Sequence, residues 1–182
     1  MDALQQEILY TTDYIENLPE GQRAELIDGH IYAMGTPTFK HQYLNTKLVS
    51  KIDQYITSNK GSCIVITAPF AVYLNKDNKN YVEPDISVIC DKSKLNDKGC
   101  WGSPDWIIEI VSPSSVRMDY HIKLFKYRTA GVREYWIVDP LKNRIMVHNF
   151  EAETMEEYSF NDVVKVGIYE DLEINFAEID ME

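Results

Sequence analysis

This chain of 182 residues lacks any apolar stretch of about 18 residues, the length that a membrane-spanning helix needs. Its first seven residues lack the basic and apolar regions of a signal peptide, so we expect a cytoplasmic protein with no membrane partner. Cysteine is also scarce. The sequence has three cysteines, Cys63, Cys90 and Cys100, which is an odd number, and no two of them have the CxxC spacing. We therefore expect the reduced thiols of a cytoplasmic protein, and neither a disulfide framework nor a zinc site.

Basic residues are few as well. The chain has 18 lysines and arginines against 29 aspartates and glutamates, which gives a net charge of -11. General nucleic-acid binders normally carry a basic excess that neutralises phosphates, so the composition argues against that class. Part of the acidic charge lies in residues 151–157, where we expect a solvated loop or a strand edge. The length suits one domain, residues 1–182, that buries its own core.

The order of helical and strand-like patterns predicts an α/β protein, bordering on α+β, with a mixed sheet flanked by helices. Apolar residues recur at three- and four-residue steps across residues 39–57, which predicts a long amphipathic helix. The Asp28-Gly29 pair favours the turn of a β-hairpin, and Gly131 suits the end of a second long helix that begins at Ser114 or Ser115. Further strands are expected near residues 63–66, 70–74, 85–90, 106–111, 134–138, 144–148, 163–168 and 172–174, and a short helix near residues 13–17.

Glu109 stands in the middle of an apolar run, residues 106–111, that has the length and β-branched character of a buried strand. An unpaired carboxylate in such a strand would cost several kcal/mol. Glu109 therefore needs a cation, a proton or a metal ion. The simplest structural interpretation is an ion pair with Lys123 or Arg128.

Asp85 is the natural partner of Glu109 in a metal site. It opens an earlier strand that is entered through Pro84, and the loop of residues 91–103 is long enough for the two strands to pair. Both carboxylates would then project from the same edge of the sheet, where two hard oxygen ligands suit Mg²⁺ or Mn²⁺. The alternative is that Asp85 is only a turn residue after proline.

Lys123 lies beside the apolar stripe of the second long helix, within reach of the strand end. Near a metal it would orient or deprotonate a water, or stabilise charge on a phosphate. The alternative is a surface lysine paired with Asp119, one helical turn earlier. Glu25, in the first hairpin strand, is either a further acid of the site or a solvent-facing residue. His41, near a helix start, is more typical of a surface or core histidine than of a ligand.

Several sequence blocks together resemble one family. They are Glu83-Pro84-Asp85, residues 104–115, residues 119–123 and residues 131–140, with residues 24–29 and His41 in support. Over residues 11–150 they resemble the Uma-type restriction endonuclease family of the PD-(D/E)XK nuclease superfamily. The resemblance implies a restriction-endonuclease-like fold and divalent-metal-dependent cleavage of phosphodiester bonds.

The resemblance also implies roles for individual residues. Asp85 matches the aspartate of the superfamily motif, Glu109 its second acid and Glu25 an additional N-terminal acid, and all three would hold Mg²⁺ or Mn²⁺. Val111 stands where the superfamily usually has a lysine, and Lys123 on the next helix is the matching position. The implied protein is a DNA endonuclease, and nucleases that cut two strands are often homodimers. The alternative is an inactive nuclease-fold module for nucleic-acid binding or oligomerisation.

Overall fold

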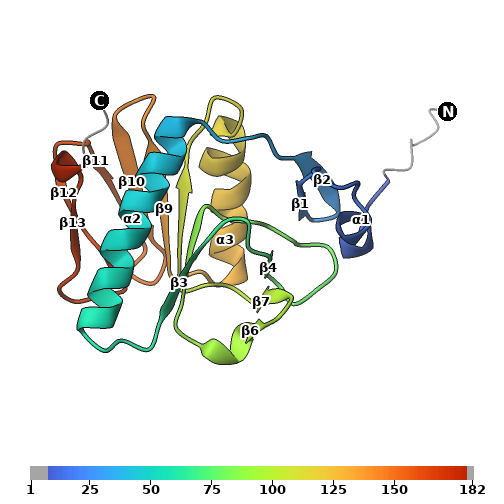
Figure 1. Cartoon of the computed structure of the whole chain (residues 1–182), viewed down its shortest axis with the longest axis horizontal. Coiled ribbons are helices and arrows are strands. Elements are labelled where there is room, and N and C mark those ends of the chain that lie inside the picture. Colours follow the sequence, from blue (N-terminus) through green and yellow to red (C-terminus); the bar gives the residue numbers. More distant parts are fainter. Residues whose placement is uncertain (1–7, 180–182) are drawn as a thin grey trace.

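A mixed sheet of six strands forms the centre of the computed structural model, which describes residues 8–179 (Figure 1). β8 and β9 pair in parallel, and the other neighbours in this sheet pair antiparallel. The predicted α/β class with a central mixed sheet is therefore confirmed. In spatial order the strands are β11 (Thr154–Tyr158), β10 (Arg144–Asn149), β9 (Glu134–Asp139), β8 (Trp106–Ile110), β5 (Ile86–Ile89) and β3 (Ile64–Thr67).

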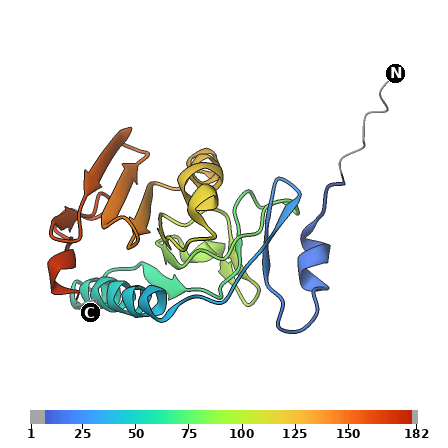
Figure 2. The same cartoon turned by 90° about the horizontal axis from the view of Figure 1, so that it is seen from above.

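Long helices cover both faces of the sheet (Figure 2). On one face lies α2 (Phe39–Ser58), whose buried Leu44, Leu48 and Ile52 follow one another at four-residue steps. On the other face, one turn of π-helix, η2 (Met118–Lys123), runs directly into α3 (Leu124–Ala130). Gly131 ends α3 in the left-handed conformation, as predicted.

The alternation of side chains along β8 decides which face receives Glu109. Trp106 and Ile108 belong to the apolar cluster under α2, and Ile107 belongs to the cluster under α3. Because successive strand residues point to opposite faces, Glu109 shares the face of Ile107 and lies beneath η2 and α3.

The N-terminal hairpin supplies a further acidic side chain to the same region. It joins β1 (Ala24–Ile27) to β2 (His30–Ala33) through Asp28 and Gly29, both at positive φ, which is the expected turn. α1 (Thr12–Glu16) precedes the hairpin. Backbone hydrogen bonds in both directions between Leu26 and Tyr81 hold β1 against the segment that leads into β5.

Residues 91–103, expected as a loop, contain regular structure instead. A 3₁₀ turn, η1 (Lys92–Lys94), precedes β6 (Leu95–Asn96) and β7 (Gly99–Trp101), and these strands form a small sheet with β4 (Val72–Tyr73). Each strand has two or three residues, too few for a periodic pattern to indicate it. At the other end of the chain, β12 (Val163–Lys165), β13 (Glu173–Asn175) and the 3₁₀ turn η3 (Phe176–Glu178) add apolar residues to the α2 face.

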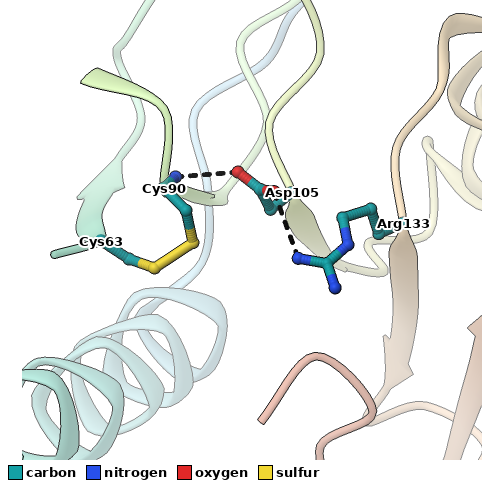
Figure 3. The surroundings of a disulfide bond; sticks show 4 residues. All are labelled: Cys63, Cys90, Asp105 and Arg133. Atoms are coloured by element: carbon teal, nitrogen blue, oxygen red, sulfur yellow. Dashed lines mark hydrogen bonds and ion pairs between the residues drawn. A yellow bond between two sulfur atoms is a disulfide. The ribbon is translucent and has the colours of Figure 1, made fainter. Parts of the chain in front are cut away.

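The prediction of reduced thiols is wrong for two of the three cysteines. Cys63 and Cys90 flank the paired residues Ile64 and Ile89 of β3 and β5, and they form a disulfide (Figure 3). They are 27 residues apart, so only the pairing of the two strands brings them together. Cys100 is a buried free thiol whose pKa burial raises to about 11. Reduced thiols were one ground for expecting a cytoplasmic protein, and that ground is lost. Within residues 8–179, no helix is long and apolar enough to span a membrane.

Candidate active site

Lys123 is the centre of a buried cluster of charges. Its Nζ lies 2.8 Å from Glu109 Oε1, 2.9 Å from Glu25 Oε1 and 4.0 Å from Asp119 Oδ1. These residues come from η2, β8 and β1, so the cluster joins the helix, the sheet and the N-terminal hairpin. Glu25, predicted as either a site acid or a solvent-facing residue, is buried and belongs to the cluster.

Asp85 adjoins this cluster at the start of β5. The Ile110 N–H donates to Asp85 Oδ2 at 2.8 Å, and the Asp85 N–H lies 3.4 Å from Glu109 Oε2. His41 Nε2, from the first turn of α2, lies 3.1 Å from Asp85 Oδ2. The structure thus brings together Glu25, Asp85, Glu109 and Lys123, the four side chains that the sequence singled out.

The pKa values of the cluster reflect its burial and its excess of acid. Burial raises the pKa of Glu109 well above its usual value, and the charges of Asp85 and Asp119 add to this, while Lys123 opposes it. Burial also raises the pKa of Asp119 to about 6. For Lys123 burial works in the opposite direction, but the surrounding carboxylates outweigh it and raise the pKa well above its usual value. Lys123 is therefore charged, and its single charge does not neutralise the acids around it.

Two members of the site were missed or underestimated from the sequence. Tyr127, which was not singled out from the sequence, is buried, and its hydroxyl donates to Glu109 Oε1 at 2.6 Å. Asp119, expected only as a pairing partner of Lys123, is buried, and its Oδ2 has no hydrogen-bond partner among residues 8–179. The four-residue spacing of Asp119, Lys123 and Tyr127 was the available signal, because it places all three on one helix face.

The donor chemistry of the site fits a divalent cation. Glu25, Asp85, Glu109 and Asp119 offer hard oxygen ligands, and Asp119 Oδ2 is buried without a hydrogen-bond partner among residues 8–179. In the structure the ammonium group of Lys123 lies between Glu25 and Glu109 and pairs with both carboxylates. As the side chains of residues 8–179 stand, no three His, Cys, Asp or Glu groups are placed to hold a metal ion.

A family model described as "Putative restriction endonuclease", Uma2, matches residues 11–177. This chain belongs to the Uma2 family. The resemblance seen over residues 11–150 is therefore confirmed and extends further along the chain.

The Uma2 assignment agrees with a solved structure. The crystal structure titled as a putative nuclease belonging to DUF820, from Anabaena variabilis ATCC 29413, superposes with a TM-score of 0.75. The likeness covers 93% of this chain and 96% of that one at 21% identity, so it shows that the two proteins share a fold. The predicted restriction-endonuclease-like architecture is thus supported by a full-length structural match.

A curated relative matches a smaller part of the Uma2-family chain. It is the "Uncharacterized protein slr1290" of Synechocystis sp. (strain ATCC 27184 / PCC 6803 / Kazusa), which is 26% identical over 98 residues. The match covers 54% of this chain and spans half the length of that relative. It therefore adds no activity, substrate or partner.

Proposed function

We propose that this Uma2-family protein is a metal-dependent endonuclease that hydrolyses DNA phosphodiester bonds. The observation that supports this most is the convergence of Asp85, Glu109, Glu25 and Lys123 from four separate segments of the chain. Asp85, Glu109 and Glu25 would hold Mg²⁺ or Mn²⁺. Such an ion, when bound, polarises the scissile phosphate and makes a bound water more acidic.

The hydrogen bonds of the two central acids leave one oxygen of each for a ligand. Glu109 Oε1 accepts from both Lys123 and Tyr127, and only the distant Asp85 N–H approaches Oε2. Asp85 Oδ2 is held by the Ile110 N–H and His41, while Oδ1 has no hydrogen bond within residues 8–179. The Asp85 side chain is 18% exposed, against 4% for Glu109, so Asp85 is the more solvent-accessible of the two acids.

Lys123 supplies the positive charge of the mechanism. Its raised pKa keeps the ammonium group charged at neutral pH. Because the group is buried, its electrostatic interactions with nearby charges are stronger than they would be in water. In the proposed reaction Lys123 orients the attacking water or stabilises the negative charge that develops on the phosphate. Tyr127 and His41 are positioning residues, since they act through Glu109 and Asp85.

The competing proposal is a nuclease-fold module without activity. The net charge of -11 and the fully ion-paired state of Lys123 favour it. It predicts nucleic-acid binding or oligomerisation without cleavage. A cytoplasmic location and a homodimer also stay predictions, and light scattering after size-exclusion chromatography tests the second.

Calorimetric titration with Mn²⁺ and Mg²⁺, followed by cleavage assays on plasmid and branched DNA, tests the nuclease proposal. Asp85→Asn and Glu109→Gln should abolish cleavage and weaken metal binding. The matched controls Asp53→Asn and Glu173→Gln change exposed acids elsewhere and should behave as wild type. Absence of metal binding, or equal cleavage by wild type and both site variants, would overturn the proposal.

A further inference from the structure

A pocket of about 410 Å³ lies on the outer side of η2 and α3, between them and the β10–β11 hairpin. Figure 2 shows α3 (yellow) beside these two strands (orange). Lys123 and Tyr127 face inward from the helix to the acidic cluster, whereas Phe125 and Arg128 belong to the pocket. The pocket is therefore separate from the candidate active site but shares its helix.

Flat rings form much of the pocket wall. Phe125 is 68% exposed, so the face of its ring is open to a ligand in the pocket. Across the pocket the Phe150 ring stacks on His148, with ring centres 6.1 Å apart, and His148 stacks in turn on Tyr135 at 6.3 Å. Such an arrangement suits a planar aromatic ligand, which can stack on exposed rings.

The pocket also holds polar groups with unused hydrogen-bonding capacity. Arg23, Arg133 and Arg144 each pair with a carboxylate. The exposed side chains of Arg117 and Arg128 make neither a hydrogen bond nor an ion pair within residues 8–179, and of these two Arg128 lines the pocket. His148 Nε2 is buried without a hydrogen-bond partner among the same residues. Burial, then the charge of Arg128, lowers the pKa of His148, so the ring is neutral at pH 7.

We propose that this pocket binds one nucleotide of the nucleic-acid strand, with its base against Phe125 and Phe150 and its phosphate at Arg128. The inference rests on the proposed nuclease function and names its substrate class, an unpaired stretch of strand. A base stacked inside a duplex presents no free face to a pocket, whereas an unpaired base does. One acid, Glu153, lines the pocket and opposes phosphate binding, so neutralising it strengthens the interaction.

Fluorescence anisotropy of a labelled 15-nucleotide oligothymidylate, in EDTA so that no cleavage occurs, tests this site. Phe125→Ala and Arg128→Ala should each weaken binding about tenfold, the order expected for loss of one stacked base or one phosphate contact. Glu153→Gln should tighten binding. Lys92→Ala, which removes an exposed positive charge in η1, is the matched control and should leave binding unchanged. Circular dichroism confirms that each variant is folded.

Unchanged affinity in folded Phe125→Ala and Arg128→Ala proteins would overturn the proposal. Equal affinity for a 15-base-pair duplex, or competition by free thymidine monophosphate at the same concentration as the oligonucleotide, would overturn the assignment to an unpaired strand. Asp85→Asn separates the two proposals, because it should retain oligonucleotide binding while losing cleavage. A wild-type protein that binds through Phe125 and Arg128 but cuts no DNA would sink the nuclease proposal and support the pocket.

Discussion

Lys123 Nζ lies 2.8 Å from Glu109 Oε1. Both side chains are buried, with 6% of the Lys123 side chain and 4% of the Glu109 side chain exposed. The two residues belong to η2 and β8 and are 14 positions apart in the chain. A carboxylate in the interior of a strand therefore has its cation from the helix that covers it.

Lys123→Met should destabilise the protein by about 3–5 kcal/mol at pH 7, because it leaves buried carboxylates without their cation. Adding Mn²⁺ should recover part of this loss if a divalent ion can enter the space between Glu25 and Glu109. Urea unfolding with and without Mn²⁺ measures both effects, with Lys165→Met on the exposed side of β12 as control. A Lys123→Met protein as stable as wild type would contradict the role of the ion pair.

Asp119→Asn should change stability in a pH-dependent way. The folded-state pKa of Asp119 is about 6, above its ordinary 3.8, so the charged form is disfavoured in the folded state and costs stability above pH 6. That cost disappears as the pH falls from 6 towards 3.8. The variant should therefore be more stable than wild type at pH 7.5, on the order of 2 kcal/mol, and similar near pH 4. Urea unfolding across this range checks it, and equal destabilisation at every pH would contradict it.

Tyr127→Phe should cost about 1–2 kcal/mol, because Glu109 Oε1 loses a buried hydrogen bond while the ring packing stays. If Glu109 acts in catalysis, the turnover number should fall as well, since Tyr127 positions that carboxylate. Tyr73→Phe is the control, because Tyr73 is buried and its hydroxyl makes no hydrogen bond within the described part of the chain. Chemical unfolding and cleavage kinetics measure the two effects. Equal behaviour of the two variants would show that the hydroxyl of Tyr127 has no special role.

The double variant Cys63→Ser/Cys90→Ser should lose about 3 kcal/mol of stability, because the disulfide closes a loop of 27 residues in the unfolded chain. Wild-type protein treated with a reductant should show the same loss. Guanidinium unfolding with and without reductant measures it. If the reductant leaves the midpoint unchanged, the two cysteines are not joined in solution.

Local sequence patterns predicted the helices and turns whose formation depends on residues close to one another in the sequence. Asp28-Gly29 predicted its hairpin turn, and the apolar spacing of residues 39–57 predicted α2 almost to its ends. The short strands β6 and β7 were not predicted, since their few residues are held by pairing with distant backbone, including β4. The disulfide escaped prediction for a similar reason, because strand pairing alone brings Cys63 next to Cys90.

The sequence by itself determined that Glu109 is a charge in a buried strand and needs a partner, because the apolar residues around it leave no other environment. It also pointed to Asp85, Lys123 and Glu25 through the family resemblance. The tertiary structure decided which of them meet, since η2 lies over β8 and the hairpin brings Glu25 to the same lysine. It also decided that Asp119 is buried, because burial depends on packing from several elements and not on local sequence.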